Sequence, residues 1–246
     1  MVKIEGRNPV IEALRGERSI DKIMVANGAK EGSIKKIIAM AKDKGVVIQY
    51  VDRKKLDEIS ESHSHQGVIA MGSDYKYYEL DEILNIAKEK GEDPFIIILD
   101  EITDPHNLGS IMRTADAVGA HGIIVPKRRS ASITPVVAKA SAGAVEYVPL
   151  CKVTNVVNAI KKLKQEGIWI AAADMQGENY YKKDLTGPIG IVIGSEGFGI
   201  SRLVKENCDF TVKIPMVGKV TSLNASVASS ILLYEVFKQR IEGKGV

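Results

Sequence analysis

The sequence predicts an α/β protein whose larger part is a parallel sheet with helices on both faces. Two observations lead to this prediction. Unbroken apolar runs, which are typical of strands buried on both faces, recur along the chain. Between these runs, apolar residues repeat with the spacing of amphipathic helices. The composition agrees, because 45% hydrophobic and 26% charged residues in 246 exclude intrinsic disorder and collagen-like repeats.

The first part of the chain alternates short strands and helices. Strands are expected at 22–26, 46–51 and 67–71, and helices at 33–44 and 53–59. Asp52 is expected to cap the second of these helices. Residues 1–72 therefore form a small α/β domain. A polar, tyrosine-rich break and an amphipathic helix that ends at Gly91 follow, and we interpret 73–91 as a linker and connecting helix.

The second domain, 92–246, carries the apolar runs. Strands are expected at 95–99, 122–125, 168–172 and 189–193, with helices at 107–119, 132–141, 154–166 and 223–240. This alternation indicates a doubly wound sheet. In such sheets, ligands bind at the carboxyl ends of the strands, so the segments that follow them are the candidate functional sites.

Charge and cysteine content limit the possible functions. The formal net charge of +3 is mildly basic and permits a nucleic-acid partner without requiring one. The two cysteines, Cys151 and Cys208, form no CxxC pair, which argues against a zinc site and a disulfide framework and fits a reducing compartment. No apolar run reaches the ~20 residues of a membrane helix. We expect a cytoplasmic protein without a bound metal or a membrane partner.

The first candidate segment is Asp100–Arg113, which follows a buried strand and opens a helix. Asn107 suits the N-cap or the first turn, and Arg113 falls on the polar face of the helix. A capped helix with a solvated arginine is the simpler interpretation. The density of polar groups at the functional edge of the sheet favours a site.

The second candidate segment is Gly194–Ser201, GSEGFGIS. Its glycine spacing matches neither the dinucleotide fingerprint nor the P-loop, so both of those nucleotide-binding classes are excluded. The segment is either a plain turn or a loop whose backbone approaches a ligand. Glu196 is its only ionisable residue.

The third candidate segment is Ile214–Ser230. Pro215 and Gly218 mark a turn, and Ser222 or Thr221 can cap the last helix. Tight helix packing explains the alanines that follow, but it explains the Ser222–Leu223–Asn224 cluster less well.

Two minor segments complete the candidates. The histidines of Ser62–Gly67 lack a third metal ligand, so RNA contact or simple exposure is expected there. Lys127–Arg129 follows a strand and is either a solvated face or a phosphate contact.

Taken together, the three main segments resemble a known family. Three stretches of the chain resemble, in order, the three motifs of the SpoU/TrmH family of RNA ribose 2′-O-methyltransferases. They are NLGSIMRTADAVGAHGIIV, IVIGSEGFGIS and IPMVGKVTSLNASVASSILLYE, and the resemblance spans about 95–240. GRNPVIEAL (Gly6–Leu14) and HQGVIA (His65–Ala70) further resemble its RlmB-type branch, which methylates a guanosine ribose in 23S ribosomal RNA.

The resemblance implies a fold, a cofactor and a partner. The C-terminal domain would be a SPOUT domain with a deep trefoil knot, which binds S-adenosylmethionine through backbone groups. The implied cofactor contacts are Gly194, Gly199, Ile214, Met216 and Leu223. The family forms homodimers packed partly through the last helix. The N-terminal domain would be a ribosomal-protein-like module that binds the RNA substrate.

The resemblance also assigns catalytic roles. Arg113 would be essential, and because free arginine is a poor base, we expect it to bind a phosphate and stabilise the nascent alkoxide. Asn107 would orient Arg113 or the ribose, Glu196 and Asn224 would complete a polar ring, and Ser222 would help to place the hydroxyl. The proton acceptor stays open.

Three alternatives remain at this stage. They are a tRNA ribose methyltransferase of the same family, a resistance methyltransferase for another ribosomal RNA site, and a catalytically silent RNA-binding or ribosome assembly factor. The intact Asn107, Arg113, Glu196 and Asn224 argue against the silent protein.

Overall fold

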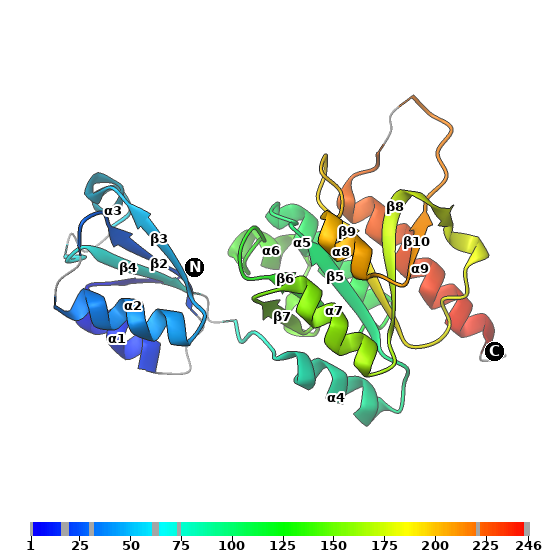
Figure 1. Ribbon diagram of the computed structural model, residues 1–246, viewed down its shortest axis with the longest axis horizontal. Helices are drawn as coiled ribbons and strands as arrows, with labels where there is room; N and C mark the ends of the chain where they lie inside the picture. The colour runs from blue at the N-terminus through cyan, green and yellow to red at the C-terminus, as the bar shows by residue number, and fades with distance from the viewer. Residues whose placement is uncertain are drawn as a thin grey trace. The chain divides into compact units, whose positions relative to one another are not determined.

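The computed structural model (Figure 1) describes residues 2–15, 20–29, 32–60, 64–72, 75–219 and 222–243. Internal contacts divide the chain into two compact units. The first is Met1–Lys76 with Ser132–Thr134, and the second is Tyr77–Ala131 with Pro135–Val246. Within the described residues, no helix has the length and apolar character needed to span a membrane.

The first unit is a four-stranded sheet with helices on both faces. Its elements are β1 (Val2–Glu5), α1 (Arg7–Arg15), β2 (Ile20–Ala26), α2 (Ser33–Asp43), β3 (Val47–Val51), α3 (Arg53–Ile59) and β4 (Val68–Gly72). The strand order is β1-β4-β2-β3, in which only β2 and β3 run parallel. Apolar residues of α1 and α2 pack on one face, and Leu56 of α3 packs on the other (Figure 1).

The second unit is a six-stranded sheet in which every neighbouring pair is parallel. Its strands are β5 (Phe95–Asp100), β6 (Gly122–Pro126), β7 (Leu150–Val153), β8 (Trp169–Asn179), β9 (Ile189–Gly194) and β10 (Phe210–Lys213). They lie in the order β10-β8-β9-β5-β6-β7. The predicted α/β fold with a parallel sheet is confirmed.

Helices cover both faces of the second sheet. They are α4 (Leu80–Lys90), α5 (Pro105–Ala117), α6 (Pro135–Ala140), α7 (Val156–Gln165), α8 (Arg202–Asn207) and α9 (Ala225–Gly243), with short 3₁₀ turns at Ala144–Glu146 and Tyr180–Lys182. Ile96 and Ile98 of β5 belong to the core shared with α4, α7 and α8, and α5 and α9 pack together on the other face of the sheet (Figure 1). The helix expected as part of a connector, α4, thus packs on the core of the second unit.

Several predicted boundaries and caps differ from the structure. The sequence did not predict five short elements: strands β1, β7 and β10 and helices α1 and α8. Strand β8 continues to Asn179, whereas it was expected to end at 172. Asp52 occupies the N-cap of α3, but its side chain caps no amide and instead accepts a hydrogen bond from Asn27. The N-cap of α5 is Asp104, whose side chain accepts from the His106 amide, so Asn107 lies in the first turn.

Candidate functional site

The site begins where two central strands end side by side. Asp100, the last residue of β5, pairs with Gly194, the last residue of β9. The Asp100 carboxylate is buried and accepts a 2.7 Å hydrogen bond from the Ser201 amide. Because Ser201 closes the loop that starts at Gly194, this bond holds both ends of that loop at the carboxyl edge of the sheet.

The loop from Gly194 to Gly199 is a tight turn that requires glycine. Ser195 and Gly199 exchange two backbone hydrogen bonds of 3.1 and 2.9 Å. Gly197 and Gly199 have φ values of 88° and 67°, which L residues rarely adopt. A Cβ on Gly194 would lie 2.1 Å from the Gly199 carbonyl carbon. The closed turn therefore presents its backbone and leaves Glu196 and Phe198 exposed at its tip.

Glu196 joins the three predicted segments. Its Oε1 accepts hydrogen bonds from Asn107 Nδ2 at 3.1 Å, from the Ala225 amide at 3.2 Å and from Asn224 Nδ2. Asn224 Nδ2 also donates to Asn107 Oδ1 at 2.9 Å. These three side chains, Asn107, Glu196 and Asn224, form one connected group, which we call the polar cluster.

Asn224 also begins the last helix. Its Oδ1 accepts from the amides of Ser226 and Val227 at 3.0 and 3.3 Å, which is the geometry of an N-cap. The prediction that Ser222 caps this helix is wrong, and its alternative, Thr221, lies outside the described residues. Ser222 instead is exposed at the edge of a cavity beside Leu223.

Arg113 lies apart from the polar cluster. It is exposed on α5, six residues after Asn107, and among the described residues no hydrogen bond or ion pair involves it. The Asn107 side chain is occupied by Glu196 and Asn224. The idea that Asn107 orients Arg113 therefore has no contact to support it within one chain.

A cavity of about 500 Å³ opens beside the polar cluster. It is lined by residues from β8, from the Gly194 loop, from β10 and the segment after it, and from α9. All five residues expected to contact the cofactor line this cavity, as do Glu196 and Ser222. The five are Gly194, Gly199, Ile214, Met216 and Leu223.

The walls of this cavity suit S-adenosylmethionine. Val212, Ala228 and Leu232 supply apolar surface, the side-chain-free turn supplies backbone groups, and the volume lies in the usual range for small-molecule sites. Asp174 adds a carboxylate. Burial acts to raise the pKa of Asp174, but its hydrogen bonds with Lys205 and the Gln176 amide outweigh this and lower it, so the group stays ionised.

Sequence reasoning missed the contribution of β8 to the cavity. Ala173, Asp174 and Met175 line it, yet the strand was expected to end at residue 172. The usable signal was position, since these residues directly follow the predicted end of the strand at 172, and segments after the strands of such a sheet are candidates for ligand contact.

In the first unit, the two N-terminal motifs meet. The Arg7 guanidinium donates to the Gln66 carbonyl at 3.1 Å, and the Gly6 amide donates to the Val68 carbonyl at 3.2 Å. His65 is buried, with Nδ1 accepting from the Gly67 amide and Nε2 2.8 Å from Asp57. The expectation of exposure or RNA contact is thus wrong for His65, while Ser62 and His63 lie outside the described residues.

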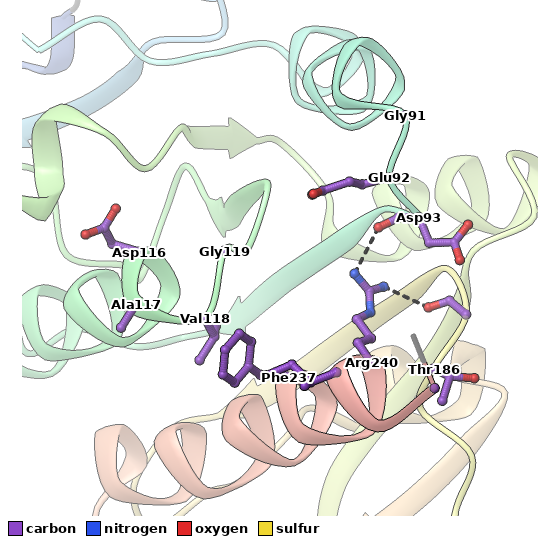
Figure 2. A pocket seen from close by; sticks show the side chains of 13 residues that line it. Gly91, Glu92, Asp93, Asp116, Ala117, Val118, Gly119, Thr186, Phe237 and Arg240 are labelled. Carbon is purple, nitrogen blue, oxygen red and sulfur yellow. Dashed lines mark hydrogen bonds between the residues drawn. The ribbon is translucent and has the colours of Figure 1, made fainter. Parts of the chain in front are cut away.

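A second cavity, of about 740 Å³, lies at the other end of the sheet of the second unit (Figure 2). Its lining includes the carboxylates of Glu92, Asp93 and Asp116, which would repel phosphates. Arg240 is held by the carbonyls of Asp93, Pro94 and Gly187 at 2.8–3.1 Å and lies over the Phe95 ring. None of the predicted site residues lines this cavity. Across the described part of the chain, no three His, Cys, Asp or Glu side chains gather as a metal site.

Comparison with known proteins identifies two family models along the chain. Residues 94–234 match the SpoU rRNA Methylase family, and residues 3–78 match the RNA 2′-O ribose methyltransferase substrate binding domain. A Bacillus subtilis protein named "Putative TrmH family tRNA/rRNA methyltransferase YacO" is 52% identical over 236 residues, which cover 96% of this chain and 94% of that protein.

Two solved structures are also similar. The SpoU methyltransferase AviRb from Streptomyces viridochromogenes in complex with AdoMet is 27% identical, with a TM-score of 0.62, and the match covers 98% of this chain and 91% of that one. A TrmH/SpoU tRNA modifying enzyme from A. aeolicus is 32% identical, with a TM-score of 0.57, but the match covers 67% of this chain and 86% of that one.

Proposed function

The chain belongs to the SpoU rRNA methylase family and is an RNA ribose 2′-O-methyltransferase that uses S-adenosylmethionine, and we propose that its substrate is a guanosine in 23S ribosomal RNA. The observation that carries the proposed site is the polar cluster at the edge of the 500 Å³ cavity. In that position a ribose hydroxyl can meet the donor methyl group while polar side chains surround the reacting oxygen.

Each residue of the site has a defined task in this proposal. When bound, S-adenosylmethionine supplies a methyl group already activated by its positive sulfur. The cofactor is held in the cavity by the five residues expected to contact it: Gly194, Gly199, Ile214, Met216 and Leu223.

The polar side chains act on the RNA. The polar cluster, held in place by its internal hydrogen bonds, orients the ribose, and Ser222 helps to place the ribose hydroxyl. Arg113, exposed and uncommitted within the described chain, binds a phosphate and stabilises the charge that develops on the ribose oxygen.

The choice of ribosomal RNA over tRNA rests on the first unit. The match to the tRNA-modifying enzyme leaves about a third of this chain uncovered, whereas a substrate-binding model matches residues 3–78. Residues 1–72 carry 13 Lys and Arg against 10 Asp and Glu, which suits phosphate contacts. The chain's two cysteines are both free, as expected in the reducing cytoplasm, where we place the enzyme.

Methyl transfer to purified RNA tests the substrate. The chain is incubated with labelled S-adenosylmethionine and either 23S rRNA or tRNA, and the 2′-O-methyl mark is mapped by primer extension at low nucleotide concentration. Label on a 23S guanosine supports the proposal. Label on tRNA alone would contradict the RNA target, and no label on either would favour a silent assembly factor. Arg113→Ala should abolish transfer while cofactor binding persists.

We further propose a homodimer packed through α9. An exposed apolar stripe runs along this helix. It consists of three side chains spaced seven residues apart, which are 39–50% exposed: Val227, Tyr234 and Ile241. Light scattering should give about 53 kDa, twice the 26.7 kDa of one chain. Tyr234→Glu should shift it to the monomer, and a wild-type monomer would overturn the proposal.

The trefoil knot expected around Gly194–Gly199 and Ile214–Asn224 is part of the same proposal. The chain crosses from β9 to the far edge strand β10 and returns to α9 beside the Gly194 loop, which suits such a path. Tracing the chain through 214–224 in a crystal structure tests it.

A further inference from the structure

Residues 127–131, which follow β6, form a braced loop at the same edge of the sheet as the cavity. The Lys127 amide donates to the Val153 carbonyl, and the Ala131 amide donates to the Ile102 carbonyl, both at 2.8 Å. The Ser130 hydroxyl closes the loop by donating to the Pro126 carbonyl. The loop is thus tied at its beginning to the last residue of β7 and at its end to the segment that follows β5.

An ion pair between two residues of unusual backbone conformation fixes the middle of this loop. Arg129 Nη1 donates to Glu101 Oε1 at 2.8 Å. Both residues have positive φ, 57° for Arg129 and 61° for Glu101, although neither is glycine. Such backbone conformations are uncommon for residues other than glycine and concentrate at functional sites. Because Glu101 balances Arg129, the uncompensated charge of the loop belongs to Lys127 and Arg128.

Arg128 is available to a partner. It is exposed, and no described residue forms a hydrogen bond or an ion pair with it. Lys127 is half-buried and likewise has no charged partner among the described residues. Two adjacent cations held on a braced loop are suited to phosphate oxygens, and arginine can bind one through two parallel hydrogen bonds.

The loop stands close to the reaction site. Strands β9, β5 and β6 are neighbours, and the pairing of Ile98 with Ile124 sets Asp100 and Pro126 at one level of the sheet. With about 4.8 Å between neighbouring strands, the end of β6 lies roughly 10 Å from Gly194 at the cavity. That separation suits phosphates of nucleotides next to the methylated one.

We propose that residues 127–131 form a phosphate-binding loop, in which Lys127 and Arg128 hold the RNA backbone beside the target ribose. This proposal deepens the function proposed above and rests on it for the identity of the RNA. The loop supplies position rather than chemistry, since phosphate contacts fix the register of the RNA and the nearby groups act on the ribose.

The experiment compares variants of the full chain that each remove one positive charge. Arg128→Ala should weaken the binding of transcribed 23S rRNA about tenfold, as expected for a lost charged hydrogen bond. It should also lower the slope of log Kd against log salt by about one. Lys161→Ala, at an exposed position on α7 where no described residue pairs with the lysine, is the matched control and should change Kd less than twofold. Arg128→Lys should recover most of the affinity.

Methyl-transfer kinetics add an independent measurement. Arg128→Ala should raise KM for the RNA about tenfold while kcat and the Kd for S-adenosylmethionine stay within twofold of wild type. Wild-type RNA affinity and salt slope in Arg128→Ala, or equal losses in Lys161→Ala, would overturn the loop proposal, as would a wild-type chain that does not bind 23S rRNA. If the wild type binds this RNA without methylating it, the binding comparison still decides the role of the loop, and only the proposed function fails.

Discussion

At the residue scale, one carboxylate oxygen holds the candidate site together. Glu196 Oε1 accepts from two asparagine side chains and from the first amide of α9. Glu196→Ala would leave Asn107 Nδ2 and the Ala225 amide without this acceptor, and we expect methyl transfer to fall about 100-fold, the scale seen when one fixed catalytic hydrogen-bonding group is removed. Glu196→Gln keeps an acceptor oxygen and should lose about tenfold. Steady-state rates with labelled cofactor measure the loss in both variants. Equal rates for wild type and Glu196→Ala would refute the proposed role of Glu196.

A second prediction at this scale concerns the buried His121. Its Nδ1 accepts from the Phe95 amide at 3.0 Å, so the proton sits on Nε2, which lies 3.1 Å from Glu92. Burial lowers the pKa of His121, although the hydrogen bond to Glu92 opposes this. Because the unfolded chain then takes up the proton more readily, the stability from His121 is complete above pH 6.5 and is lost as pH falls towards the folded pKa.

The loss can be at most about 1.4 kcal/mol per pH unit from this group. Trp169 is the only tryptophan and lies in the second unit, so its fluorescence during urea unfolding reports on that unit. His121→Asn retains an acceptor near the Phe95 amide and should show a smaller loss of stability between pH 6.5 and 5.5. An unchanged pH dependence in this variant would contradict the assignment.

The members of the polar cluster could be predicted, but their contacts could not. Asn107 and Glu196 stood out because each follows an apolar strand, yet they lie 89 residues apart, and only the pairing of β5 with β9 brings them together. Ser222 and Asn224 are both good N-cap residues. Local preference could not choose between them, and the contacts of Asn224 with Asn107 and Glu196 do.

At the scale of elements, apolar periodicity found the buried strands and most of the helices, but it missed three four-residue strands and the helices α1 and α8. Strands β7 and β10 have only four residues each, too few to show a period. The outer half of β8 reads as polar, and its Gly177 lies so close to β10 that a Cβ would meet the Thr211 backbone at 2.6 Å. This close approach depends on a distant segment, which local sequence does not reveal.

Glycine substitutions test how the Gly194 turn shapes the cavity. In Gly194→Ala the new Cβ would meet backbone atoms of Gly199 and Ile200 at 2.1–2.3 Å, so the turn must open. We expect binding of S-adenosylmethionine to weaken at least tenfold in calorimetry. Gly187→Ala is the control, because a Cβ there meets nothing within 4 Å and should leave both affinity and melting temperature unchanged. Unaltered cofactor affinity in Gly194→Ala would show that the turn does not form the binding surface.

At the scale of the whole molecule, each unit has a sheet and a hydrophobic core of its own. The first core joins α1 and α2 to their sheet, and another lies between the second sheet and the helices α4, α7 and α8. The alternation of apolar runs predicted two domains, but it could not assign α4, because an amphipathic helix needs a partner and the sequence does not name it. Its Leu80 and Ile83 pack with Ile96 and Ile124, so a fragment that keeps this core must include α4.

This division predicts how a fragment of residues 77–246 behaves. It retains the whole second sheet, α4 and every residue that lines the 500 Å³ cavity, so its Kd for S-adenosylmethionine should stay within about twofold of the full chain. It lacks the 13 Lys and Arg of residues 1–72, so its affinity for 23S rRNA should fall at least tenfold and depend less steeply on salt. Calorimetry and filter binding measure the two affinities separately. A fragment that binds the cofactor and also holds the RNA as tightly as the full chain would show that the second unit alone carries substrate recognition.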